Sequence, residues 1–343
     1  MTEGHGDDLY KYEGLIRYNF SSNIYSQADL RPVKEHLAKS LELIERYPEP
    51  EPWSLERLIA QENRLDDGEV MVTNGATEAI YIIARCLNDV VGDGSCLNVI
   101  SQPTFSEYAD ACRSCNAPVS ENDNGAECKK VYWICNPNNP DGTVIDKSEL
   151  LRRADNNPLD FFVIDQSYEQ YTLEPMIAAR EAAARNNIII IHSMTKRFCI
   201  PGLRIGHVIA GAGMISRLKA LRHPWSVNAL AVEAGCYLIR QGFNAMPDIE
   251  SYLDEAQRLR RLLDNIRGVD VLPTKTNFML VHIHGHKAAD LKEFLVEKYG
   301  ILIRNASNFV GLDESFFRVA AQSKEANDLL VEALKDFMSG GNS

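Results

Sequence analysis

The sequence Asn187-Ile188-Ile189-Ile190-Ile191-His192-Ser193-Met194-Thr195-Lys196 decides the fold class of this chain. Its run of isoleucines is apolar, β-branched and short, which is typical of a strand buried on both faces of a parallel sheet. A hydroxyl residue and a lysine end the stretch, and Arg204 follows Lys196 by eight residues, beyond a Pro-Gly turn. This order predicts a buried strand that ends at a reactive lysine, with an arginine nearby to bind an anion.

Size and composition exclude several classes of protein. The chain has 343 residues, 45% hydrophobic and 24% charged, as in an ordinary globular protein of about two domains. Its net charge of −12 argues against nucleic acid as a partner, because phosphate backbones require basic surface. We find no membrane-length apolar run, no signal-peptide pattern, and no disulfide framework among the eight cysteines. We therefore expect a cytoplasmic protein that binds neither nucleic acid nor membrane.

Strand and helix patterns alternate through the middle of the chain. Strands are expected at 69–73, 96–101, 130–135, 160–164, 187–191 and 203–210, and helices at 77–87, 106–115, 147–154 and 176–185. Such repeated units predict an α/β fold, with a largely parallel sheet covered by helices on both faces.

The pattern changes after two long helices expected at 227–242 and 249–266. Beyond Pro273, strands are expected at 277–283, 300–304 and 316–321, and helices at 288–299 and 324–337. This order predicts a smaller α+β domain. We predict a segment over 1–40 that packs with the small domain, a large domain over 41–245 and a small domain over 246–343.

Ligands of open α/β sheets bind where the strands end, so the residues at those ends are the candidates for a site. The turn Gly75-Ala76-Thr77 begins a helix whose free N–H groups can bind phosphate. Phe105 and Asn139 follow the next two strands. The fourth strand leads into Asp165 and Tyr168, where a carboxylate at the end of an apolar strand requires a cationic partner.

Together with Lys196 and Arg204, these positions resemble the fold-type I pyridoxal-phosphate (PLP) enzymes of the class I and II aminotransferase family. The resemblance implies a PLP-dependent transferase-like fold, with a mostly parallel central sheet in the large domain. It also implies that Lys196 forms a Schiff base with PLP and then serves as the mobile acid or base.

The same resemblance implies the remaining cofactor contacts. Asp165 would pair with the pyridine nitrogen, while Tyr168 and Asn139 would hydrogen-bond the phenolic oxygen; Asp165 and Tyr168 join Lys196 as the catalytic residues. The phosphate would be held by Gly75, Ala76, Thr77, Ser193 and Arg204, and the ring would stack on Phe105. Tyr47 would reach the cofactor phosphate of a neighbouring subunit, which implies a homodimer with shared active sites.

Segments 5–8, 19–24, 224–231, 301–305, 311–313 and 317–320 are similar to those of threonine-phosphate decarboxylases, enzymes of cobalamin side-chain assembly. The resemblance implies that Arg318 takes a substrate carboxylate, while Arg304, with His5 and Asn23, takes a substrate phosphate. It predicts decarboxylation of the small phosphorylated amino acid L-threonine O-3-phosphate to 1-aminopropan-2-ol O-phosphate.

Histidinol-phosphate aminotransferases share the general motif pattern of this family. An aminotransferase acting on histidinol phosphate or a related amino acid, with 2-oxoglutarate, therefore stays open as an alternative. Three segments depart from the usual family pattern: Gln166-Ser167 follow Asp165, Asp141 stands in the Asn-Pro turn, and Gln322 replaces a frequent arginine. These departures bear on the substrate more than on the cofactor.

His282, His284 and His286 suggest a metal site at first sight. Alternation along a strand would put His282 and His284 on one face, but a zinc site usually needs a third ligand. We interpret this segment as a solvent-facing strand end and expect no metal.

Overall fold

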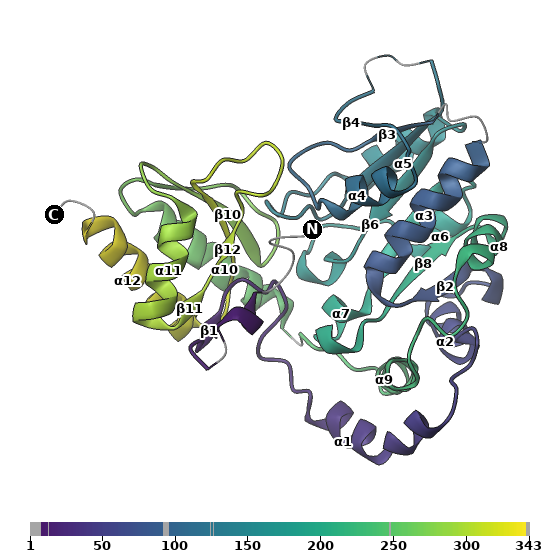
Figure 1. The fold of residues 1–343 in the computed structure, drawn as a ribbon, viewed down its shortest axis with the longest axis horizontal. Coiled ribbons are helices and arrows are strands. Elements are labelled where there is room, and N and C mark those ends of the chain that lie inside the picture. Colours follow the sequence, from purple (N-terminus) through teal and green to yellow (C-terminus); the bar gives the residue numbers. More distant parts are fainter. Residues whose placement is uncertain are drawn as a thin grey trace.

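The computed structural model describes residues 8–340, except 13, 92–95, 124, 126 and 247. A seven-stranded sheet in the order β2-β8-β7-β6-β5-β3-β4 forms the larger lobe (Figure 1). Its strands are β2 (Val70–Thr73), β3 (Leu97–Val99), β4 (Val119–Ser120), β5 (Lys130–Cys135), β6 (Phe161–Asp165), β7 (Ile188–Ser193) and β8 (Gly206–Ala210). The pairs that include β8 are antiparallel, and the other pairs are parallel. The carboxyl ends of β2, β3, β5, β6 and β7 therefore share one edge, as the strand patterns predict.

Helices cover both faces of this sheet. Ile189 and Ile191 of β7 pack in one hydrophobic cluster, whereas Ile188 and Ile190 pack in another on the opposite face. One face carries α3 (Gly75–Val91), α4 (Glu107–Ser114) and α8 (Ala212–Leu221), and the other carries α2 (Trp53–Asn63), α5 (Lys147–Asn156), α6 (Ala179–Ala183) and α9 (Ala229–Arg240). The expected double-sided burial of the isoleucine run is confirmed.

The smaller lobe is built on a four-stranded antiparallel sheet in the order β12-β13-β10-β9. Its strands are β9 (Val269–Val271), β10 (Phe278–Ile283), β12 (Arg304–Asn305) and β13 (Phe316–Ala320), and its helices are α10 (Ile249–Asp264), α11 (Ala288–Tyr299) and α12 (Lys324–Gly340). The core of this lobe lies between the sheet and these helices. No helix in the described part of the chain is long and apolar enough to cross a membrane.

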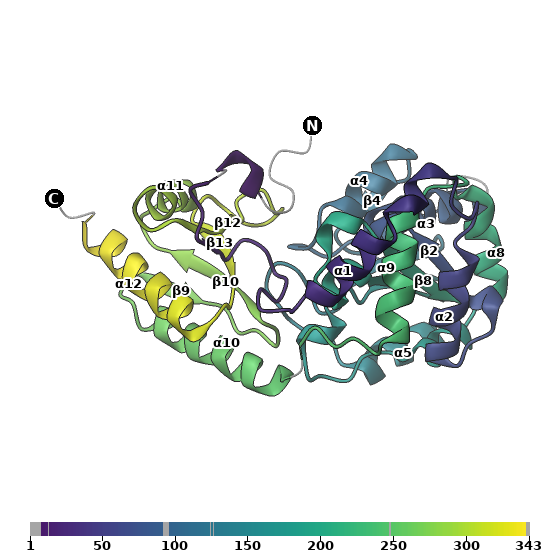
Figure 2. The ribbon, with the colours of Figure 1, turned by 90° about the horizontal axis from the view of Figure 1, so that it is seen from below.

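The N-terminal segment crosses from the smaller lobe to the larger one (Figure 2). Strand β1 (Tyr18–Asn19) pairs in parallel with β11 (Ile301–Leu302) of the smaller lobe. Helix α1 (Arg31–Lys39) instead packs on the larger lobe, where Val33 joins the cluster formed by α2 and α9. The domain boundaries stay predictions.

Several elements differ from the expected pattern. The strand expected at 300–304 is divided at Ile303 into β11 and β12, which pair with β1 and β13. The strand expected from 203 begins at Gly206, because Pro201–Leu203 form a 3-10 helix and Arg204 has a φ of 55°. The helix expected at 176–185 is shortened, since Gln166 hydrogen-bonds both backbone groups of Ile177 and holds it outside the helix.

The Asn-Pro turn after β5 contacts the chain that enters β10. Gly142 in this turn has a φ of +73°, and its carbonyl accepts a hydrogen bond from Lys275 N at 3.0 Å. A Cβ at this position would lie 2.0 Å from Thr274 Oγ1 and 2.5 Å from Thr276 Oγ1. Glycine is required here both for its backbone conformation and for the close approach of the two lobes.

We expect Gly142→Ala to lower the free energy of unfolding by roughly 2–4 kcal/mol, because strain at positive φ adds to the cost of overpacking. Gly311→Ala is the matched control: Gly311 has a φ of +85°, but a Cβ there meets nothing within 4 Å. The Gly311→Ala substitution should lower the free energy of unfolding by about 1 kcal/mol. Denaturant unfolding of both variants measures the difference, and equal costs would contradict the role given to the contact with Thr274 and Thr276.

Candidate active site

A cavity of about 390 Å³ lies at the carboxyl edge of the large sheet and extends to the smaller lobe. The structure brings together in its wall the predicted residues Asn23, Ala76, Thr77, Phe105, Asn139, Asp165, Tyr168, Ser193, Lys196, Arg204, Arg304 and Arg318. Gly75 directly precedes Ala76 at the start of α3. Tyr47 lies elsewhere on the surface, and His5 falls outside the described residues.

The register of three strands builds one end of this cavity. Gly206 of β8 pairs with Thr73 at the end of β2 and with Ser193 at the end of β7. This pairing sets the beginning of α3 beside the beginning of α7 (Met194–Arg197), the short helix that carries Lys196. A side chain on Gly206 could not fit, because its Cβ would lie 2.8 Å from Ala76 N.

This end of the cavity has the donors that an anion requires. The first residues of α3 offer backbone N–H groups and the positive end of a helix. The guanidinium of Arg204 lies so close to Gly75 that a Cβ there would be 2.7 Å from Nη2. The hydroxyl groups of Ser193 and Thr195 line the same cavity, and Thr195 Oγ1 has no hydrogen-bond partner among the described residues.

Asp165, at the end of β6, is a buried residue with an exposure of 5%. Tyr108 OH donates a hydrogen bond to Oδ2 at 2.8 Å, and Ser167 N donates one to Oδ1 at 2.9 Å. Burial raises the pKa of this carboxyl, and the bonds from Ser167 and Tyr108 offset part of the rise. A cationic group in the cavity would favour the ionised form of Asp165 further.

Lys196 lies among polar groups that can orient its amine. Its Nζ donates to Asn23 Oδ1 at 3.2 Å and lies 5.6 Å from the centre of the Tyr168 ring. Asn23 Nδ2 in turn donates to Tyr168 OH at 2.8 Å, so one amide connects the lysine with the phenol. Burial raises the pKa of Tyr168, which keeps its hydroxyl protonated at neutral pH.

Two arginines from the smaller lobe form the other end of the cavity. Arg304 of β12 and Arg318 of β13 are directly opposite in the antiparallel register, and both are buried, at 7% and 5% exposure. Arg318 donates to Asn139 Oδ1 and to Ser21 O, while Arg304 donates to Asn308 Oδ1 at 2.9 Å. Like charges directly opposite on a sheet are destabilising, so this pair is suited to share an anionic ligand.

Several residues of the cavity escaped the sequence analysis. Tyr108 is the clearest, and its signal was its position in the first turn of the helix expected at 106–115, three residues after Phe105. Thr195 is the hydroxyl residue directly before Lys196, whereas Asn308 gave no signal of its own. Gln322 is buried outside the cavity wall, and its side chain donates to Asn19 O at 3.1 Å.

Comparisons with known proteins agree with this geometry. The family model described as aminotransferase class I and II matches residues 16–334. A putative threonine-phosphate decarboxylase from Caldanaerobacter subterraneus is 30% identical, over 98% of this chain and 94% of its own length. A histidinol-phosphate aminotransferase from the same organism is 29% identical, over 85% of this chain and 84% of its own length.

Among solved structures, the L-threonine-O-3-phosphate decarboxylase from Porphyromonas gingivalis superimposes with a TM-score of 0.88. It is 35% identical to this chain, and the match covers 94% of this chain and 99% of that protein.

The chain therefore belongs to the class I and II aminotransferase family, a family of PLP-dependent enzymes. The predicted fold class and the family resemblance are both confirmed.

We expect Asp165→Asn to stabilise the cofactor-free protein at high pH, because it removes a buried charge whose ionised form is disfavoured by desolvation. Since burial raises the folded-state pKa of Asp165, its ionisation destabilises the wild type as pH rises through that pKa. The melting temperature of the variant should therefore exceed that of the wild type at about pH 8 and approach it at about pH 4.

Asp146→Asn is the control of opposite sign. Hydrogen bonds from Ser148 and Glu149 lower the pKa of Asp146, which caps α5, so its ionisation favours folding as pH rises. A difference between wild type and Asp165→Asn that does not change with pH would contradict the electrostatic explanation.

Proposed function

We propose that the protein is a PLP-dependent enzyme that decarboxylates L-threonine O-3-phosphate to 1-aminopropan-2-ol O-phosphate and CO₂, a step of cobalamin side-chain assembly. The observation that carries this proposal is the buried pair Arg304 and Arg318, because two arginines at one end of a cavity suit a small substrate with two anionic groups. Relatives with the names threonine-phosphate decarboxylase support it.

The donor set of the cavity fits PLP. The beginning of α3, Ser193 and Arg204 would hold the cofactor phosphate, and Thr195 offers a further hydroxyl without a partner among the described residues. Asp165 would face the pyridine nitrogen, and Phe105 would stack on the ring. Tyr168 and Asn139 would hydrogen-bond the phenolic oxygen.

Bound PLP supplies an electron sink for the bond that breaks at the substrate Cα. The Lys196 amine would bond covalently to the cofactor in the resting enzyme and later move a proton. In the decarboxylation, the bond between Cα and the carboxylate carbon breaks, CO₂ leaves, and Lys196 delivers the proton that replaces it at Cα. Asn23, which contacts both Lys196 Nζ and Tyr168 OH, would orient the amine during this transfer.

Arg318 would bind the substrate carboxylate and thereby set which Cα bond stands perpendicular to the cofactor plane. Asn139 and Ser21 O, which accept its hydrogen bonds, hold the guanidinium in place. Arg304, with Asn308 beside it, would bind the substrate phosphate, and His5 and Asn23 are proposed as further phosphate ligands. Both anionic groups of threonine phosphate would thus be anchored, which fixes the substrate in one orientation.

We also propose a homodimer in which Tyr47 reaches the cofactor phosphate of the other subunit. Tyr47 is 86% exposed, and its ring lies 5.6 Å from that of Trp225. Leu41, Ile44 and Trp53 are further exposed apolar side chains on the same stretch of chain. Exposed apolar side chains that follow one another along one stretch of chain favour a protein interface. A monomer in sedimentation analysis would contradict this part of the proposal.

The reaction is tested by incubating the PLP-loaded protein with L-threonine O-3-phosphate alone and measuring the products by mass spectrometry. We expect catalytic formation of 1-aminopropan-2-ol O-phosphate without any 2-oxo acid. Lys196→Ala should lower turnover by more than the roughly 10²–10⁴-fold that a general acid or base supplies, because it also removes the covalent anchor. Unaltered substrate, with conversion of histidinol phosphate when 2-oxoglutarate is added, would establish the aminotransferase instead.

The two arginines should differ in their kinetic effects. Arg304→Gln should raise KM for threonine phosphate and lower kcat/KM by roughly 10–100-fold, since it removes charged hydrogen bonds to a group remote from the reacting bond. Arg318→Gln should raise KM and lower kcat together, because the carboxylate contact also sets bond orientation. Steady-state kinetics of both variants provide the comparison. Unchanged kinetics in either variant would remove that arginine from the substrate site.

A further inference from the structure

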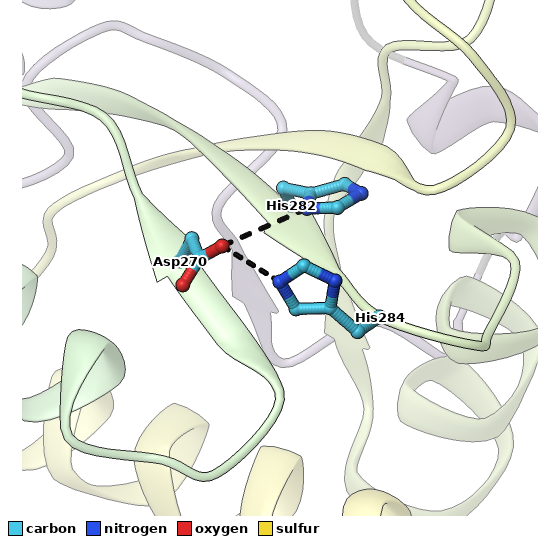
Figure 3. Close-up of side chains that lie close together, drawn as sticks. All are labelled: Asp270, His282 and His284. Atoms are coloured by element: carbon cyan, nitrogen blue, oxygen red, sulfur yellow. Dashed lines mark hydrogen bonds and ion pairs between the residues drawn. The ribbon is translucent and has the colours of Figure 1, made fainter.

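A cluster of two histidines and an aspartate lies outside the cavity, on the sheet of the smaller lobe. In the antiparallel register of β9 and β10, His282 is directly opposite Asp270. The backbone pairing continues one step past β10, where His284 N donates to Gly268 O at 2.8 Å. His282 and His284 therefore share a face with Asp270, and Figure 3 shows both imidazoles directed toward its carboxylate.

The distances in this cluster are close to those of a metal centre. His284 Nε2 is 2.7 Å from Asp270 Oδ2, and His282 Nδ1 is 3.9 Å from the same oxygen. The three candidate ligand atoms all lie within 4.8 Å of one another. Ligand atoms about 2.0–2.2 Å from a tetrahedral Zn²⁺ are roughly 3.3 Å apart, which lies between the two measured separations. Rotations of the exposed Asp270 and His284 side chains would adjust these separations, whereas His282 is half-buried.

Neighbouring groups orient these ligands and add negative charge. The ring of Phe316, directly opposite His282 on the other side of β10, stacks on the imidazole at 4.7 Å and limits its rotation. Asp313, whose carboxylate accepts a hydrogen bond from Ser315 N at 2.9 Å, interacts electrostatically with His282. A cation between the histidines would therefore be coordinated by the Asp270 carboxylate. The Asp313 carboxylate would add a second negative charge outside the coordination sphere, as outer-shell groups of metal sites commonly do.

We propose that Asp270, His282 and His284 form a binding site for one divalent transition-metal ion, with Zn²⁺ as the fitting probe. Imidazole nitrogen with a single carboxylate suits zinc, nickel or copper, whereas magnesium and calcium require oxygen ligands throughout. Asp270 supplies the third ligand that the histidine spacing alone lacked. The exposure of His284 and Asp270 leaves room for water as a fourth ligand.

Such an ion would join an edge strand to the centre of its sheet. β9 has β10 as its neighbour and lies at the end of the strand order. A metal bridge from Asp270 to the histidines would hold β9 on β10 in the folded state and not in the unfolded chain. Metal binding should therefore raise the melting temperature of the protein, by linkage, without contact with the active-site cavity.

The test is calorimetric titration of Zn²⁺ into the purified, metal-free full-length protein. We expect one site that is lost in both His284→Gln and Asp270→Asn, with affinity reduced by more than the roughly 10–100-fold caused by removing an outer-shell partner. His286→Gln is the matched control, since His286 packs against Phe337 with ring centroids 5.1 Å apart. It should bind Zn²⁺ as the wild type does, and melting temperatures of the metal-free variants establish that all are folded.

Three results would overturn the proposal. They are the absence of Zn²⁺ binding by the wild type, binding that persists in His284→Gln and Asp270→Asn, and equal loss in His286→Gln. Zn²⁺ binding that persists in both variants would indicate that the ion binds to another side chain, such as a cysteine. Because the three residues lie outside the cavity, turnover of the metal-free His284→Gln variant should equal that of the wild type. This readout separates the metal site from the proposed decarboxylase function, which can fail or hold independently.

Discussion

The burial of β7 on both faces is the constraint on which the rest of this structure depends. Ile188 to Ile191 contribute alternately to clusters on the two sides of the sheet, so the strand cannot shift by one residue without exchanging its faces. The register of β7 with β8 then aligns Ser193 with Gly206, and the register of β8 with β2 aligns Gly206 with Thr73. The positions of Lys196, Arg204 and the beginning of α3 all follow from that alignment.

Charge distribution gives the cavity its chemical character. The chain carries a net charge of −12, yet the charged residues lining the cavity, within the described part of the chain, are Lys196, Arg204, Arg304 and Arg318 against Glu107 and Asp165. Burying a charge costs free energy, and burial accordingly lowers the pKa of Arg304. The anionic groups of the proposed cofactor and substrate would offset this cost.

Contacts between the lobes connect the proposed cofactor residues with the proposed substrate residues. Asn139, in the turn after β5, accepts a hydrogen bond from Arg318 of the smaller lobe. Gly142 in the same turn packs against Thr274 and Thr276, at the entrance to β10. A displacement of the smaller lobe would therefore move the proposed carboxylate ligand relative to the cofactor residues. This coupling is a physical reason for the tight fit at Gly142.

The sequence by itself determined the class of fold and predicted most of the residues that line the cavity at the edge of the large sheet. Strand exits can be located from local periodicity, and parallel strands necessarily bring their carboxyl ends to one edge. Tertiary structure alone decided that Arg304 lies opposite Arg318, that Tyr108 bonds Asp165, and that Asp270 meets the two histidines. These relations depend on register between strands and on packing between distant segments. The register between strands cannot be predicted from local sequence, because register is set by the fit of whole faces in the folded core.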